Sequence, residues 1–471
     1  MHTFEKFYIN GEWVAPSGSA VIEVVNPTTE QVCGSVPSGD AADVDTAVAA
    51  AKAAFPDWAA TPAAERSAFI AQLTAKLDEN KEDIGALISE QLGMPIGWSI
   101  AIQVGLPTGV MASYIDLPAE MDKEEEVGNS LVIREPIGVC GFITPWNYPL
   151  HQIVGKVAPA LAAGCTMVLK PSSETPLDAF KFAELIDEVG LPAGVFNLVT
   201  GPGRVVGEAI AVHADVDMLS ITGSTEAGVR VAELAAPTVK RVTQELGGKS
   251  ASVVLEGADL ATAVGGAVVS LSINTGQTCA ALTRLIVPSS KRDEVVAIAK
   301  AAAETVVVGG AFEEGAGMGP MVSRSQQETV RKYIRSGIDQ GATLVTGGLD
   351  MPAGKDEGYF VAMTIFADVT NDMTIAQEEV FGPVLSIICY DTEEEAIAIA
   401  NDSPYGLSGA VWGEPENAKK VARQIRTGQV FINGGDFNIA APFGGYKQSG
   451  NGRELGAQGL HEFIEIKSLQ L

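Results

Sequence analysis

The chain has 471 residues, of which 46% are hydrophobic and 19% charged, so it can bury large apolar cores and is neither disordered nor fibrous. Its 59 acidic and 31 basic residues give a net charge of −28, which excludes recruitment by nucleic acid or by an anionic membrane surface. Five scattered cysteines without a Cys-x-x-Cys pair indicate reduced thiols rather than a disulfide framework or a zinc site. The sequence shows no signal segment and no apolar stretch long enough to cross a bilayer, so we expect a cytoplasmic protein without a membrane partner.

The N-terminal segments combine a β-hairpin with helices. Residues 7–14 predict the hairpin, because Asn10-Gly11 supplies a tight turn between alternating apolar positions. Residues 40–55 and 62–92 predict two amphipathic helices, and Gly93 ends the second of them.

Two polar, alternating segments predict strands outside the main body. The charged run 121–126 and the alternating residues 129–134 predict a protruding loop and strand. The last residues, 461–471, also alternate and therefore need a partner strand, which another subunit could supply.

From 137 to 248, short apolar runs alternate with helical patterns, which predicts a parallel sheet with helices on both faces. Ligands of such sheets bind at the carboxyl ends of the strands. The expected strands are 139–143, 166–169, 195–199, 218–221 and 241–246, and the expected helices are 152–163, 177–189, 204–213 and 225–236.

A second α/β unit follows, in which a packed helix at 260–273 precedes the loop that contains Cys279. Its expected strands are 252–255, 282–287, 383–390, 408–412 and 429–433, and its helices include 293–305 and 325–341.

Cys279 is the candidate nucleophile. Its loop lies between a helix and a strand, and the preceding Gly-Gln-Thr turn lets backbone N–H groups approach the thiol. An inert buried cysteine is the alternative, and for an isolated cysteine it would be the better interpretation. The motifs at the strand ends of the first unit favour the nucleophile.

Two of these motifs suit a phosphate-bearing cofactor. The turn from Thr222 to Gly228 joins a strand to a helix, so its free N–H groups and the helix dipole favour phosphate. Lys170 ends another strand at the same edge and could bind a ribose hydroxyl or a phosphate. An ordinary glycine-rich helix start and a solvated lysine are the alternatives.

Two further motifs suit the chemistry itself. The stiff loop Thr144-Pro-Trp-Asn-Tyr-Pro149 can direct the amide of Asn147 at a developing oxyanion, although Asn147 could instead cap the next helix. Glu245 ends an apolar strand before Gly247-Gly248, which suits a general base of raised pKa; a structural ion pair is the alternative.

In this order and over nearly the whole chain, the motifs resemble the aldehyde dehydrogenase superfamily. The matching segments are Pro145-Trp-Asn-Tyr-Pro149, Lys170-Pro-Ser172, Thr222-Gly-Ser-Thr-Glu-Ala-Gly228, Glu245-Leu-Gly-Gly-Lys249, Gly276-Gln-Thr-Cys279, Glu378-Glu-Val-Phe-Gly-Pro383 and Pro442-Phe-Gly-Gly-Tyr-Lys-Gln-Ser-Gly450.

The resemblance implies an α/β fold with a Rossmann-like NAD(P)-binding domain, a second α/β catalytic domain and a small bridging β element that joins subunits into homodimers or homotetramers. We assign 1–117 and 137–247 to the cofactor domain, 248–448 to the catalytic domain, and 118–136 and 449–471 to the bridging segment.

By the same resemblance, Cys279 is the nucleophile, Asn147 an oxyanion donor and Glu245 the general base, and the protein oxidises an aldehyde to a carboxylic acid. The implied cofactor residues are Ile143, Thr144, Pro145, Trp146, Lys170, Ser172, Ser173, Gly203, Gly223, Ser224, Leu246, Gly247, Glu379 and Phe381. The implied aldehyde tunnel contains Tyr148, Gln152, Thr278, Phe437 and Phe443, together with Trp146.

The position three residues after Lys170 departs from the family pattern, because many NAD-preferring relatives have a glutamate where this chain has Ser173. Without that carboxylate a 2′-phosphate is not repelled, so we expect dual use of NAD and NADP. A cysteine-dependent hydrolase and a non-catalytic binding protein descended from the enzyme remain the alternatives. A hydrolase would need a histidine partner; none of the four histidines is an obvious one, although His151 closely follows Asn147.

Overall fold

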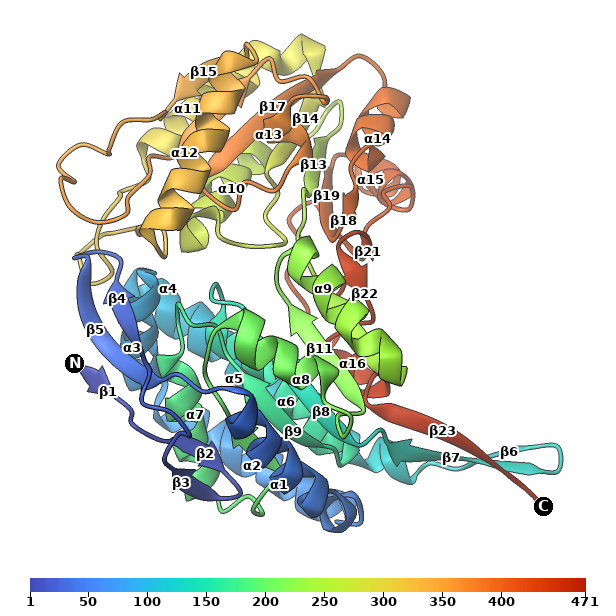
Figure 1. Cartoon of the computed structure of the whole chain (residues 1–471). Helices are drawn as coiled ribbons and strands as arrows, with labels where there is room; N and C mark the ends of the chain where they lie inside the picture. The colour runs from blue at the N-terminus through green and yellow to red at the C-terminus, as the bar shows by residue number, and fades with distance from the viewer.

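Two largely parallel β-sheets, each covered by helices, organise the chain, and a narrow β arm projects from the first of them (Figure 1). The computed structural model describes all residues from Met1 to Leu471. Apolar clusters pack on both faces of each sheet. The α/β fold expected from the sequence is therefore confirmed.

The first sheet has eight strands in the order β22-β12-β11-β8-β9-β10-β2-β3. Its parallel centre consists of β8 (Val139–Ile143), β9 (Thr166–Lys170), β10 (Phe196–Leu198), β11 (Met218–Thr222) and β12 (Arg241–Glu245). The hairpin β2 (Phe7–Ile9) and β3 (Glu12–Val14) adds one antiparallel edge, and β22 (Gly450–Asn451) adds the other. Because β9 and β11 both neighbour β8, the chain leaves β8 in two directions, which opens a crevice at the carboxyl ends of β8 and β11.

The helices of this unit follow the predicted alternation with one difference. They are α1 (Ala41–Ala59), α6 (Pro149–Ala163), α7 (Leu177–Glu188), α8 (Glu208–Val212) and α9 (Thr225–Ala235). The helix predicted at 204–213 is a π-helical turn, η3 (Gly203–Gly207), followed by α8. Pro202 stands at the start of that turn, where a residue without an N–H is tolerated.

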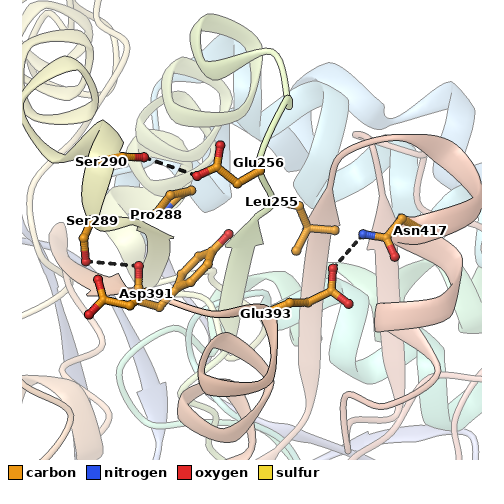
Figure 2. A pocket seen from close by; sticks show the side chains of 9 residues that line it. Leu255, Glu256, Pro288, Ser289, Ser290, Asp391, Glu393 and Asn417 are labelled. Atoms are coloured by element: carbon orange, nitrogen blue, oxygen red, sulfur yellow. Dashed lines mark hydrogen bonds between the residues drawn. The ribbon is translucent and has the colours of Figure 1, made fainter.

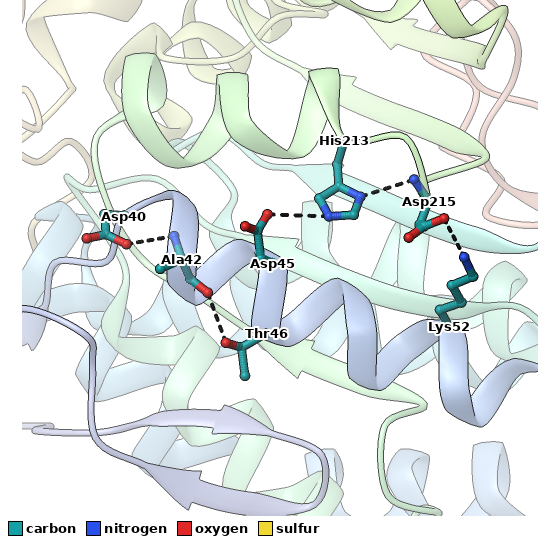
Figure 3. A network of polar contacts seen from close by, with 7 residues as sticks. All are labelled: Asp40, Ala42, Asp45, Thr46, Lys52, His213 and Asp215. Atoms are coloured by element: carbon teal, nitrogen blue, oxygen red, sulfur yellow. Dashed lines mark hydrogen bonds and ion pairs between the residues drawn. The ribbon is translucent and has the colours of Figure 1, made fainter.

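Polar contacts hold α1 to the loop after α8 (Figure 3). The Asp40 carboxylate accepts a hydrogen bond from the first turn of α1 at 2.8 Å, which caps the helix. Asp45 and Lys52 on α1 pair with His213 and Asp215. Because these pairs are partly exposed, they help to position α1 but contribute little to the stability of the unit.

The prediction of one helix over 62–92 is wrong. The segment forms α2 (Ala63–Glu79) and α3 (Lys81–Leu92), which meet at Asn80. The Asn80 side chain donates to the carbonyl of Lys76 at 2.9 Å, so it competes with the helix ladder. The apolar spacing continues through Asn80, and the interruption is therefore invisible in the pattern.

A continuous helical run, Ile96–Asp122, follows and is long and apolar enough to span a membrane by length and composition alone. The sequence analysis did not expect such a run. Here it packs against α2, α3 and α6 as part of the protein body. It contains α4 (Ile96–Trp98), η1 (Ser99–Gly105), α5 (Leu106–Ser113) and η2 (Leu117–Asp122).

The second sheet has seven strands in the order β15-β16-β17-β14-β13-β19-β20, and it forms the upper lobe of Figure 1. Its strands are β13 (Ala251–Val254), β14 (Arg284–Pro288), β15 (Thr343–Thr346), β16 (Thr364–Ala367), β17 (Val384–Tyr390), β19 (Ser408–Trp412) and β20 (Gln429–Ile432). Its helices are α10 (Leu260–Ser272), α11 (Arg292–Glu304), α12 (Arg324–Asp339), α13 (Thr374–Gln377), α14 (Glu393–Asn401) and α15 (Pro415–Ala422). The sequence analysis did not predict β15 and β16, which are four residues long each.

The arm consists of β6 (Glu125–Val127), β7 (Ser130–Pro136) and β23 (Ile464–Gln470). The C-terminal strand finds its partner within the chain, because β23 pairs with β7 along its whole length. One edge of β23 has no neighbour in the sheet, and Ile466 and Leu471 are 63% and 81% exposed. Other short elements include β1 (His2–Thr3), β4 (Val21–Asn26), β5 (Gln31–Pro37), β18 (Tyr405–Gly406), β21 (Tyr446–Lys447) and α16 (Gly456–His461).

Candidate active site

The loop that carries Cys279 is tightly constrained. Asn274, Thr275 and Gly276 are consecutive left-handed residues, with φ of 50°, 57° and 69°. A β-branched residue in this region is strained, and Thr275 is held there by a hydrogen bond from its hydroxyl to the carbonyl of Gly319 at 3.0 Å. Gly276 is required because a Cβ would lie 2.2 Å from the carbonyl oxygen of Gly382. The loop therefore presents Cys279 in a fixed orientation.

Asn147 ties the loop after β8 to the Cys279 loop. The side-chain amide of Asn147 donates to the backbone carbonyl of Gln277 at 3.0 Å. The backbone carbonyl of Asn147 accepts a hydrogen bond from the side-chain amide of Asn274 at 2.8 Å. Only one of its two amide hydrogens is used in this way, so the other remains available. The helix-cap alternative does not apply, because the N-cap residue of α6 is Tyr148.

Cys279 is the only residue that lines both of two neighbouring cavities, of about 230 and 490 Å³. The smaller cavity is lined by Pro145, Trp146, Asn147, Thr222, Gly223, Ser224, Glu245, Leu246, Gly247, Cys279, Gln326, Glu379 and Phe381. All three predicted catalytic residues and eight of the predicted cofactor residues are therefore brought together there.

The smaller cavity lies at the carboxyl ends of β11 and β12 and includes the start of α9. Ser224 is the N-cap residue of α9, and its hydroxyl accepts from the backbone N–H of Ala227 at 3.2 Å. The rings of Trp146 and Phe381 meet edge to face at 5.2 Å. A cavity lined mainly by polar residues and glycines, at a helix N-terminus and bounded by aromatic rings, suits part of a dinucleotide.

The other predicted cofactor residues lie at the same sheet edge but do not line this cavity; they are Ile143, Thr144, Lys170, Ser172, Ser173 and Gly203. Lys170 is buried, which lowers its pKa to about 8, and its ammonium donates to the carbonyl of Pro171 at 2.9 Å. The Ser173 hydroxyl donates to the carbonyl of Gly201 at 3.2 Å. These residues therefore lie along the same edge of the first sheet, outside the smaller cavity.

Gln326 and Thr222 also line the smaller cavity, and the sequence analysis did not assign either. Gln326 comes from the first turn of α12, and its amide donates to the carbonyl of Phe381 at 3.0 Å. No local motif marks it, because its position depends on how the second sheet packs on the first. Thr222 lies in the predicted turn and could have been included.

Glu245 is a buried carboxyl without a hydrogen-bond partner for either oxygen. Burial raises its pKa well above the usual value, and the negative charge of Glu454 adds to the effect. Lys156 pairs with Glu454 and donates to the Thr222 hydroxyl at 2.7 Å, and its positive charge acts in the opposite direction. A carboxyl in this setting can take a proton from water, as a general base requires.

The surroundings of Cys279 disfavour its thiolate. Burial raises its pKa to about 12, and the charges of Glu379 and Glu245 contribute. Burial also raises the pKa of Glu379 to about 7, although the backbone N–H of Gly248 donates to it at 3.0 Å. A positive charge bound in the smaller cavity would favour the thiolate.

The larger cavity is mostly apolar, and five of the six residues assigned to the tunnel line it. Tyr148 and Thr278 share a hydrogen bond of 2.7 Å between their hydroxyls, and the rings of Phe437 and Phe443 lie 6.2 Å apart. Trp146 was also placed in the tunnel, but it lines the smaller cavity, because its ring packs on Phe381.

Several walls of the larger cavity were not predicted. They include His151, the residues Ala263, Gly266, Ala267 and Ser270 of α10, and Phe431 and Trp412 of the second sheet. No aspartate, glutamate, lysine or arginine lines it. Small residues on a helix carry no distinctive signal, because the same pattern is typical of ordinary packing.

A third cavity, of about 220 Å³, lies at the carboxyl ends of β13, β14 and β17 (Figure 2). Its carboxylates are partly satisfied, since Ser290 donates to Glu256 at 3.2 Å and Asn417 donates to Glu393 at 2.7 Å. It contains no cysteine and none of the predicted site residues. No group of three or more His, Cys, Asp or Glu side chains is arranged to hold a metal ion.

Comparisons with known proteins agree with this geometry. The profile described as "Aldehyde dehydrogenase family" matches residues 13–469. A 3-succinoylsemialdehyde-pyridine dehydrogenase of Pseudomonas sp is 49% identical over 472 residues, covering 100% of this chain and 99% of its own. A putative aldehyde dehydrogenase of Staphylococcus aureus is 46% identical, with the same coverage.

Two similar solved structures contain a cofactor. A cysteine-to-alanine mutant of aldehyde dehydrogenase C from Pseudomonas syringae, with NAD⁺ and octanal, has a TM-score of 0.98 and 49% identity and covers 99% of this chain and 96% of its own. A Mycobacterium tuberculosis aldehyde dehydrogenase with NAD⁺ has a TM-score of 0.97 and 45% identity and covers 100% and 98%.

Proposed function

The chain belongs to the aldehyde dehydrogenase family, and we propose that it oxidises an uncharged aldehyde to a carboxylic acid through Cys279, Glu245 and Asn147. The observation that carries this proposal is that Cys279 alone lines both a cavity of mainly polar residues and glycines and a cavity of mainly hydrophobic residues. A nucleophile in that position can receive an aldehyde from one side and a cofactor from the other.

The residues divide the reaction between them. The Cys279 thiolate adds to the aldehyde carbonyl, and the free amide N–H of Asn147 and the backbone N–H of Cys279 stabilise the resulting oxyanion. A dinucleotide in the smaller cavity would supply the hydride acceptor that converts the thiohemiacetal to a thioester. Glu245 then deprotonates the water that hydrolyses the thioester.

The smaller cavity fits a nicotinamide dinucleotide in its donor groups. The start of α9 at Ser224 offers N–H groups to phosphate, and Glu379 can accept from a ribose hydroxyl. NAD⁺ is the cofactor in the two related structures. We further propose that NADP is also used, because the uncharged Ser173 occupies the position where a carboxylate would repel a 2′-phosphate.

The aldehyde is proposed to be uncharged because no ionised side chain lines the larger cavity. A carboxylate tail there would lose its hydration without gaining a cationic partner. Octanal, which the Pseudomonas syringae structure contains, is such an uncharged aldehyde.

The division into a cofactor domain (1–117 and 137–247), a catalytic domain (248–448) and a bridging segment (118–136 and 449–471) remains our proposal. The two sheets support the first two parts, and the β6-β7-β23 arm supports the third. We also propose a cytoplasmic homodimer or homotetramer, because the free edge of β23 can pair with another subunit.

A cysteine hydrolase is less well supported. His151 lines the larger cavity with Cys279, but its Nδ1 has no hydrogen-bond partner. Burial lowers the pKa of His151 to about 4, which makes it a poor base at neutral pH.

The test is aldehyde-dependent reduction of NAD, followed as reduced-nicotinamide absorbance, with octanal and with a carboxylate-bearing semialdehyde. Octanal should be the better substrate, and Cys279→Ala should abolish the reaction while NAD still binds. Cys389→Ala, a cysteine on β17 in neither cavity, is the matched control and should retain activity. Octanal oxidation by Cys279→Ala near the wild-type rate would refute the proposal.

A further inference from the structure

The first turn of α6 places two neighbouring polar side chains, His151 and Gln152, in the wall of the otherwise largely apolar cavity beside Cys279. The mechanism above uses neither of them. In a wall whose other members are mostly hydrophobic or small, such polar side chains can fix the orientation of a ligand.

Each of these side chains has one atom buried without a hydrogen-bond partner, Nδ1 in His151 and Oε1 in Gln152. An unpaired buried acceptor is tolerated more often than an unpaired buried donor. The arrangement that leaves acceptors unpaired therefore puts the hydrogen on Nε2 of His151 and leaves the Nε2 amide hydrogens of Gln152 free. In this arrangement both residues offer N–H donors to the cavity.

Both donors are uncharged. Burial lowers the pKa of His151 to about 4, the positive charge of Lys156 acts in the same direction, and the Glu454 charge opposes it. Neutral N–H donors pair well with a carbonyl oxygen, an ether oxygen or a ring nitrogen. They do not replace the cation that a carboxylate would need.

We propose that the protein prefers aldehydes whose apolar chain also carries an uncharged hydrogen-bond acceptor, such as a keto oxygen, and that His151 and Gln152 recognise this acceptor. The inference rests on the proposed function, since His151 and Gln152 would bind the acceptor while the aldehyde carbon lies at Cys279. It makes the two residues determinants of specificity, with no part in the chemical step.

A matched pair of aldehydes tests the proposal: 4-oxo-4-phenylbutanal and 4-phenylbutanal, which have the same chain length and differ at the keto group. For the wild type, kcat/KM should be about tenfold higher for the keto aldehyde, as expected for one net hydrogen bond. Gln152→Met, which keeps the side-chain length, should remove most of this preference by lowering kcat/KM more for the keto aldehyde than for 4-phenylbutanal. Gln458→Met, on the exposed surface of α16, is the matched control and should leave the preference unchanged.

His151→Leu provides a second test if Gln152→Met does not fold, and it should also reduce the preference. Equal kcat/KM values for the two aldehydes in the wild type would overturn the inference and would mean that water satisfies both side chains. A variant that lowers kcat/KM for both aldehydes by the same factor would also overturn the inference. Failure of the proposed function looks different, because then neither aldehyde would be oxidised.

Discussion

Among single residues, Glu245 offers the sharpest test, because it should act only after the hydride has been transferred. Glu245→Gln should give one rapid round of cofactor reduction per site and then slow turnover, by roughly 10²–10⁴-fold, since the thioester lacks a base for its water. Because the carboxylate is the active form and burial raises its pKa, wild-type turnover should increase with pH. Rapid-mixing absorbance measurements resolve the two phases.

Loss of the burst in Glu245→Gln would show that Glu245 also deprotonates Cys279. Iodoacetamide labelling of Cys279 provides the control, because its rate should be similar in the variant and in the wild type if the base acts only on water.

Cofactor choice also depends on one position. Ser173→Glu should lower kcat/KM for NADP by roughly tenfold or more, corresponding to ~1.4 kcal/mol of repulsion, and should leave NAD use nearly unchanged. Ser173→Ala separates the loss of the hydroxyl from the gain of charge. Steady-state kinetics with both cofactors decide the question, and the prediction fails if the wild type already rejects NADP as strongly as Ser173→Glu does.

At the scale of elements, the end of α3 is fixed by Gly93, the residue that stops the helix. Gly93 has φ of 88°, and a Cβ would lie 2.6 Å from Pro320. Gly93→Ala should therefore destabilise the fold by about 1–3 kcal/mol, measured as a lower midpoint of thermal or denaturant unfolding.

Gly97→Ala is the matched control, because Gly97 lies in α4 and a Cβ there meets nothing within 4 Å. That variant should be neutral or stabilised by up to about 1 kcal/mol. Equal destabilisation by both substitutions would contradict the role given to Gly93.

The sequence predicted best those elements whose signal is local. Buried runs such as Val139–Ile143 are apolar throughout and end at turn residues, so their limits could be located closely. The break at Asn80 could not, because apolar spacing continues across it.

The residues of the candidate site also fall into those that a local motif predicts and those that it does not. Residues in motifs at strand ends, such as Glu245 and Ser224, could be assigned because the motif fixes their place on the sheet edge. Gln326 and Gly266 could not, because they reach the cavities only when distant helices pack together. Cavity walls are a property of the tertiary fold, which residue spacing does not encode locally.

At the scale of the whole molecule, the arm is the region most open to association. Ile466 and Leu469 are 63% and 39% exposed on β23, whose outer edge is unpaired. Replacing both with lysine should shift the protein towards monomers, because charge on an edge strand opposes pairing. Light scattering after size-exclusion chromatography measures the shift, and an unchanged mass would argue that subunits associate elsewhere.

Val307→Lys is a control for surface charge alone, since Val307 is 51% exposed and lies outside the arm. Its mass in solution should match that of the wild type.

Because the two cavities meet at Cys279, the acid product and the cofactor can leave the enzyme by different routes. Since Cys279 is the only residue common to both cavities, a ligand that enters or leaves one cavity need not pass through the other. An acid product could then depart, and a fresh aldehyde arrive, while the opposite cavity is still occupied. Ligand exchange in one cavity is then independent of ligand exchange in the other. The slower of the two exchanges limits the rate of turnover without preventing the faster one.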